Sequence, residues 1–270
     1  MNSFLKALST PTIFVLLLGI ITGCDSGSDN DDAAPPVFSR GAFFLETELF
    51  SGVGGKNSQT GLNFISAAAR VGSMTTILAV HTAIPGAITT AALQANPTFS
   101  DGIWTWTRTI SHDDRSLEFS LTAKPGPAET EWAMTVSMDD QYLDESYSDY
   151  NLFTGLTKNN GSSGSWELYY KVGGIRTKVL TGSFNQPDED TGQVTYRIPA
   201  TAESGAGDTV LYQADGIQRS FFWTQVQASL THDIRWNTHN STGSIRSGNY
   251  RNGTLSCWDV YFDDAGCPSS

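Results

Sequence analysis

Few side chains in this sequence could perform catalysis. Its histidines are His81, His112, His232 and His239. His112 precedes Asp113 and Asp114, and His232 precedes Asp233, so each group could relay a proton. No serine elbow, zinc-protease helix or paired-cysteine motif accompanies them. His81 is predicted to be a core residue, and structural roles are preferred over catalytic ones for His112 and His232. No catalytic residue, metal site or cofactor is assigned.

Carboxylates offer a second kind of chemistry. Five acidic residues stand between Asp139 and Asp149, and calcium binds several such oxygens at once. Their spacing matches no known calcium loop, so a solvated connection is the preferred interpretation. The alternative is a surface enzyme acting on a polymer, with two carboxylates facing each other at ~5–10 Å. Its candidate residues are Asp113, Asp114, Asp139 and Asp144.

The chain has three cysteines, Cys24, Cys257 and Cys267. Cys257 and Cys267 lie ten residues apart near the C-terminus, and an exported domain would allow them to form a disulfide. This bridge is predicted to hold the last strand against the C-terminal tail. A zinc site is disfavoured because no histidine or further cysteine stands at ligand spacing.

The first 24 residues read as an export signal. An apolar run from Ile13 to Ile21 follows Lys6, and it is too short for a comfortable membrane span. The closing Ile21-Thr22-Gly23-Cys24 resembles the lipobox of bacterial prolipoproteins. This resemblance implies that residues 1–23 are a removed signal peptide and that the Cys24 thiol carries lipid. The protein would then be anchored to a membrane of the bacterial cell envelope, in an unspecified leaflet, without spanning it.

Charge and composition restrict the partners. The chain carries a formal charge of −12, and loss of residues 1–23 removes only the cation Lys6, which makes it −13. Nucleic acid is therefore not an expected partner. Residues 24–36 are acidic and end in two prolines, which predicts a flexible tether between the lipid and the fold. Residues 37–270 are predicted to form a single β-rich domain.

A helical pattern covers residues 62–95. Phe64, Ala68 and Val71 repeat at steps of three and four, and Asn63 could cap the helix start. Pro85-Gly86 interrupts the pattern, so we expect two helices in succession. Because this stretch is apolar on most sides, we expect it to be buried against a sheet.

From about residue 102 to 262 the pattern has period two. Turn signals separate the apolar runs and predict ten to twelve strands in an antiparallel meander. The expected fold is mainly β with a small α part, in which the meander forms a curved half-barrel or barrel packed on one or two buried helices. This layout resembles the half-barrels of bacterial lipoprotein carriers.

Seven tryptophans lie in or beside the predicted strands. Core packing is the preferred interpretation, and a sugar-binding face is the alternative. Together these features favour a lipid-anchored, non-catalytic binding protein for an apolar small molecule or a protein partner. The alternatives are a cell-surface or periplasmic enzyme and a glycan-binding module acting on a polymer.

Overall fold

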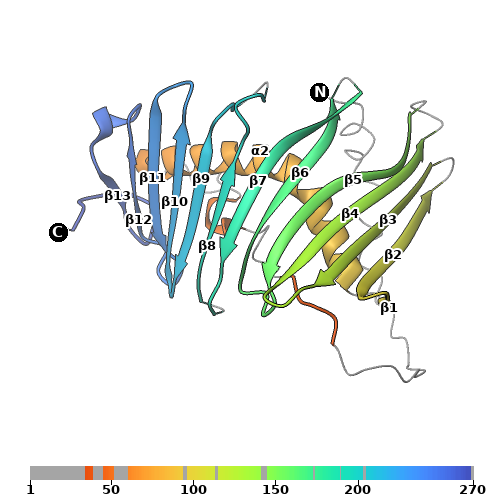
Figure 1. Ribbon diagram of the computed structural model, residues 1–270. Helices are drawn as coiled ribbons and strands as arrows, with labels where there is room; N and C mark the ends of the chain where they lie inside the picture. The colour runs from red at the N-terminus through yellow and green to blue at the C-terminus, as the bar shows by residue number, and fades with distance from the viewer. Residues whose placement is uncertain are drawn as a thin grey trace.

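A computed structural model describes residues 34–38, 45–51, 60–93, 96–112, 115–140, 145–172, 174–188, 190–202 and 205–268. One long sheet and one long helix make up most of this part of the chain (Figure 1). A 3₁₀ turn, η3 (Glu48–Phe50), precedes the helix α2 (Leu62–Leu93), and a second, η5 (Arg251–Gly253), lies between the late strands. The strands are β1 (Thr98–Ser100), β2 (Ile103–His112), β3 (Arg115–Pro125), β4 (Glu129–Asp140), β5 (Glu145–Lys158), β6 (Ser163–Val172), β7 (Ile175–Asn185), β8 (Thr191–Arg197), β9 (Thr209–Asp215), β10 (Gln218–Gln225), β11 (Leu230–Asn237), β12 (Gly243–Ser247), β13 (Ser256–Trp258) and β14 (Asp264–Ala265).

The sheet is an antiparallel meander, as predicted. Its fourteen strands pair in sequence order from β1 to β14, and it does not close on itself. The structure therefore confirms the predicted curved, open sheet, and the sheet does not close into the barrel that was the other predicted form. The strand number exceeds the predicted ten to twelve because β1 and β14 have only three and two residues, too few to show an alternating pattern.

Helix α2 lies across one face of the sheet, here called the inner face. It contacts β12, β13 and β14 near one edge and β2 and β3 near the other. Phe64, Ala67, Val71, Met74 and Leu78 form its buried stripe. Among the described helices, none combines the length and apolar character needed to cross a bilayer.

The predicted break at Pro85-Gly86 is absent, because α2 continues through it as one helix. A proline at position 85 cannot donate to the carbonyl oxygen of His81, one turn earlier. The Tyr170 hydroxyl of β6 donates to that oxygen at 3.2 Å. A sheet residue thus replaces the missing helical hydrogen bond, which explains why local sequence rules predicted two helices where there is one.

Aromatic rings fill the space between α2 and the sheet. All the tryptophans except the half-buried Trp104 are buried, so the core interpretation of these residues holds. Two rings pack directly over glycines of neighbouring strands. A Cβ on Gly182 would lie 2.1 Å from Cε2 of Trp166, and a Cβ on Gly243 would lie 2.2 Å from Cζ2 of Trp258. These glycines provide the room that the indole rings occupy.

The C-terminal strands close over the start of α2. Cys257 and Cys267 form the predicted disulfide, with their Cα atoms 5.2 Å apart. The Asp264 carboxylate accepts a hydrogen bond from the backbone N–H of Asn63 at 2.8 Å. The Asn63 side chain, expected to cap the helix, instead donates to the carbonyl oxygen of Cys257 at 2.7 Å. The cap therefore comes from the far end of the chain.

We predict that Gly182→Ala lowers the free energy of unfolding by about 1–3 kcal/mol, because the added methyl group overlaps the Trp166 ring. Gly72→Ala is the matched control, since a Cβ there meets nothing within 4 Å inside α2. This control should raise the free energy of unfolding by up to about 1 kcal/mol. Denaturant unfolding measures both. Equal stability of Gly182→Ala and wild type would contradict the packing of Trp166 on this glycine.

Candidate functional site

The described residues do not bring the candidate catalytic histidines and carboxylates together in one site. Asp113, Asp114 and Asp144 lie outside the described residues, as do the side chains of His112 and Asp139. The described residues include no group of three or more histidine, cysteine or acidic side chains that could hold a metal ion. The enzyme hypothesis at these carboxylates therefore remains a prediction.

His232 and Asp233 point to opposite faces of β11 and do not act as a pair. His232 is buried, and its Nδ1 lies 2.8 Å from Oγ of Ser247 while its Nε2 lies 2.9 Å from Oε1 of Gln225. Ser247 is fully buried and also bonds to Arg70 and Asn249, so this serine has no access to a substrate. The cluster is a structural network between α2 and the sheet.

His81 lies on α2 against the ring of Tyr170, with the ring centroids 5.6 Å apart. Burial lowers the pKa of His81, which favours the neutral imidazole. Within the described part of the chain, its Nδ1 has no hydrogen-bond partner, and the same is true of the buried hydroxyls of Tyr150 and Tyr196. His239, in contrast, is an exposed turn residue whose backbone N–H donates to Asn237.

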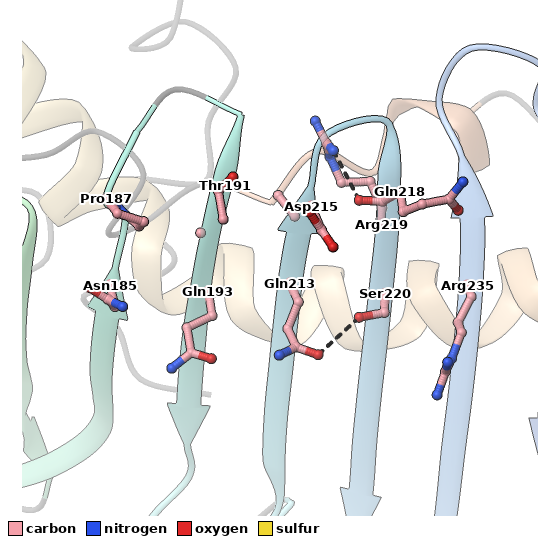
Figure 2. A pocket seen from close by; sticks show the side chains of 12 residues that line it. Asn185, Pro187, Thr191, Gln193, Gln213, Asp215, Gln218, Arg219, Ser220 and Arg235 are labelled. Carbon is pink, nitrogen blue, oxygen red and sulfur yellow. Dashed lines mark hydrogen bonds between the residues drawn. The ribbon is translucent and has the colours of Figure 1, made fainter.

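A hollow of about 530 Å³ lies on the other, outer face of the sheet, away from α2 (Figure 2). Its volume is in the range of small-molecule sites. A row of side chains on neighbouring strands crosses it, and successive members are direct cross-strand partners. We call these residues the amide row: Asn185, Gln193, Gln213, Ser220 and Arg235. Its members stand on β7 to β11, one from each strand.

The amide row faces outward because buried and outward-facing side chains alternate along each strand. Phe184, Val194, Tyr212, Phe221 and Ile234 stand next to the row residues and are buried in the core. Because successive side chains of a strand point to opposite faces, their polar neighbours must point outward. Within the row, the Ser220 hydroxyl donates to Oε1 of Gln213 at 3.3 Å. The side chains of Asn185 and Gln193 form no hydrogen bond with the described part of the chain.

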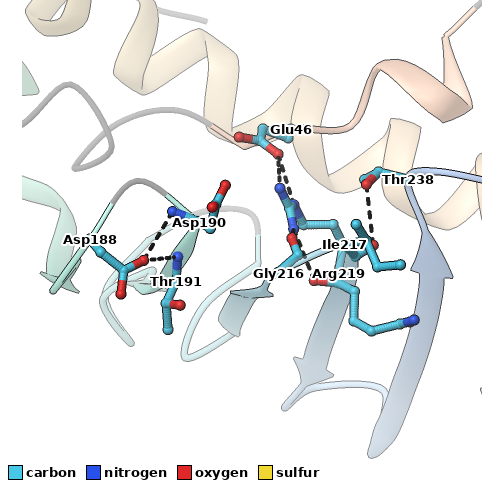
Figure 3. A network of polar contacts seen from close by, with 9 residues as sticks. Glu46, Asp188, Asp190, Thr191, Gly216, Ile217, Arg219 and Thr238 are labelled. Atoms are coloured by element: carbon cyan, nitrogen blue, oxygen red, sulfur yellow. Dashed lines mark hydrogen bonds and ion pairs between the residues drawn. The ribbon is translucent and has the colours of Figure 1, made fainter.

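The two arginines that line the hollow are both engaged by carboxylates. Arg235 donates from Nε and Nη2 to the two oxygens of Asp233, at 2.9 and 3.0 Å. This carboxylate raises the pKa of Arg235. Arg219 is buried and pairs with Glu46 at 2.7 Å, on the rim of the hollow (Figure 3). The charge of each guanidinium is therefore compensated by a carboxylate.

The rim of the hollow is formed by tight turns. The Asp188 carboxylate accepts hydrogen bonds from the backbone N–H groups of Asp190 and Thr191, which closes the β7–β8 turn (Figure 3). Arg219 holds the β9–β10 turn through the carbonyl oxygen of Gly216 at 2.5 Å. Asp215 adds a carboxylate to this edge. The described residues of the rim thus include two carboxylates, Asp188 and Asp215.

No family model, curated protein or solved structure matches this chain. Function is therefore inferred from the residues of this chain alone.

Sequence reasoning missed the amide row. A signal was present, because each row residue adjoins an apolar residue in an alternating run. The alternation places such residues on the outer face without showing which of them stand side by side. Their alignment depends on the register of five strands, which the turns and the core determine together.

We predict that His232 makes stability depend on pH. Burial and nearby Arg70 lower its pKa to about 4 from an ordinary 6.5, an effect that Asp208 partly offsets. The unfolded chain therefore binds more protons than the folded chain between these values. The contribution of His232 to the free energy of unfolding should be fully present above its unfolded pKa of 6.5. The free energy of unfolding should fall by about 3 kcal/mol as the pH drops to 4.

Unfolding measured between pH 7.5 and 4 tests this prediction. His232→Gln should be less stable at pH 7.5 and should lack this share of the pH dependence. His239→Gln, on the exposed turn, should follow the wild type. A wild-type pH profile in His232→Gln would show that another group is responsible.

Proposed function

We propose that this chain is a non-catalytic binding protein held on a membrane of the bacterial cell envelope by lipid on Cys24, and that it binds its ligand in the outer hollow. The lipobox supports the anchor. The observation that carries the binding proposal is the amide row, in which Asn185 and Gln193 are exposed side chains without hydrogen-bond partners in the described chain. Such groups, mounted on rigid strands, are available to a ligand.

The outer face is favoured over the inner face because the inner face is already covered. Helix α2 spans it from β12 to β2, and the N-terminal segment adds Phe38 and Phe50 to the buried core. Phe38, for example, packs edge-on against Trp132 with the ring centroids 5.2 Å apart. A ligand can reach the outer hollow without displacing any of these groups.

An apolar ligand or partner chain on the inner face is the second candidate. It is supported by three polar atoms on that side that find no partner among the described residues, Nδ1 of His81 and the hydroxyls of Tyr150 and Tyr196. Buried polar atoms are usually hydrogen-bonded, and a ligand with a polar group could satisfy them.

The proposed tether enters the domain at the end of the sheet where the hollow lies. The carbonyl of Val37 lies against Gly161 in the β5–β6 turn. Antiparallel order places the β7–β8 and β9–β10 turns, which form the rim, at this same end. The ten residues from 24 to 33 would reach up to about 35 Å when fully extended. The hollow would therefore lie toward the membrane-facing end of the domain.

We predict that Cys24→Ser abolishes lipid attachment, because the thiol is the acceptor. Metabolic labelling with radioactive palmitate and separation of membrane from soluble material measure the change. The wild type should be labelled and sediment with membranes, whereas Cys24→Ser should be unlabelled. Cys257→Ser is the matched control and should keep its label. Label on Cys24→Ser would refute the anchor.

We predict that binding to envelope material depends on the amide row. The domain starting at Val37 would be mixed with isolated bacterial cell envelopes and sedimented. Gln193→Ala/Gln213→Ala should reduce the sedimented fraction several-fold, because it removes two hydrogen-bonding amides from adjacent strands. Thr224→Ala/Thr231→Ala is the control, a cross-strand pair on the outer face beyond the hollow.

Equal sedimentation of the two double variants would remove the hollow as the binding site. If Tyr196→Phe then weakened envelope binding, the second candidate, a ligand on the inner face, would replace the first. Circular dichroism and denaturant unfolding would confirm that each variant is folded.

A further inference from the structure

We propose that the outer hollow binds an uncharged oligosaccharide that lies across the strands along the amide row. This inference rests on the proposed binding function and adds the chemical class of the ligand. It uses three features of the hollow, which are its hydrogen-bonding groups, its charge and the apolar side chains beside it.

The hydrogen-bonding groups of the row match sugar hydroxyls. An amide carries both a donor and an acceptor, and so does a hydroxyl group, so each can satisfy the other in both directions. The row places Asn185, Gln193 and Gln213 on three adjacent strands, followed by the hydroxyl of Ser220. With strands about 4.8 Å apart, the five residues span about 19 Å. That is longer than one sugar ring, so the row fits a chain of sugars.

The charges at the hollow disfavour an anionic ligand. The guanidinium of Arg235 is held by both oxygens of Asp233, and Arg219 is paired with Glu46. The Asp215 carboxylate stands on the rim with no cation paired to it among the described residues. A sulfated or carboxylated polymer would meet repulsion there without a free cation in return. The ligand is therefore expected to be uncharged.

An apolar patch adjoins the row on the same face. Phe222 and Leu211 are direct cross-strand partners, and Phe222 follows Ser220 by two positions. Both side chains are half-buried, and the guanidinium carbon of Arg235 lies 5.3 Å from the centre of the Phe222 ring. Sugar rings have apolar C–H faces that leave water when they pack on such a surface. Polar and apolar groups thus stand side by side, as an oligosaccharide requires.

Isothermal titration calorimetry of the full chain, purified in a detergent without sugar groups, with defined hexasaccharides tests this inference. The uncharged probes are maltohexaose, cellohexaose and chitohexaose, and the anionic probe is hexagalacturonate. At least one uncharged probe should bind the wild type, and Gln193→Ala/Gln213→Ala should weaken it about tenfold. The control Thr224→Ala/Thr231→Ala should bind like the wild type.

Asp233→Asn provides a second, independent test of the charge argument. This change removes the negative charge that engages Arg235 and leaves the guanidinium available. Hexagalacturonate should then bind at least several-fold more tightly than it binds the wild type, while the uncharged probe changes little.

The outcomes separate this inference from the function on which it rests. Tighter binding of hexagalacturonate than of every uncharged probe by the wild type would overturn the inference. So would the failure of all three uncharged probes to bind while envelope binding still depends on the amide row; in that case the binding function stands. If the amide-row double variant bound envelopes as well as the wild type, both the inference and the proposed binding function would be overturned.

Discussion

The structure depends on the packing of one helix across a very wide sheet. A helix of 32 residues is about 48 Å long, and fourteen strands about 4.8 Å apart make a sheet about 62 Å wide along its surface. Contact of α2 with both ends of the sheet is achieved because the sheet curves around the helix. Close approach is helped by Gly182 and Gly243, which leave room for indole rings. Curvature, core and helix position are therefore aspects of the same packing.

This packing assigns different tasks to the two faces. The inner face is apolar, aromatic and covered, and it accounts for the buried tryptophans. The outer face carries the amide row and, beside it, the half-buried Phe222 and Leu211. Since the core determines the register on the inner side, it also aligns the amide row on the outer side. The proposed binding surface needs no flexible loop to organise it, because its residues are positioned by the strands themselves.

The fold could be predicted from the sequence wherever a local pattern was long. The alternating runs after Gly102 indicated the meander, and two cysteines ten residues apart indicated the disulfide. The break at Pro85 was wrongly predicted, because Tyr170 supplies a hydrogen bond that no local rule includes. The amide row was missed for a related reason. Its residues are ordinary one by one, and only the register of five strands gathers them.

The Asp264 cap on α2 has a consequence for how the chain folds. The meander consists of neighbouring hairpins, which can form one after another as their residues become available. The bond between Asn63 and Asp264 joins residues 201 positions apart, so the start of the helix cannot be completed until the last strand is present. Until β12, β13 and β14 have formed, the start of α2 therefore lacks the strands that cover it. Packing of the start of α2 thus requires contacts over long sequence separations, which slow folding and prolong the exposure of apolar surface to aggregation.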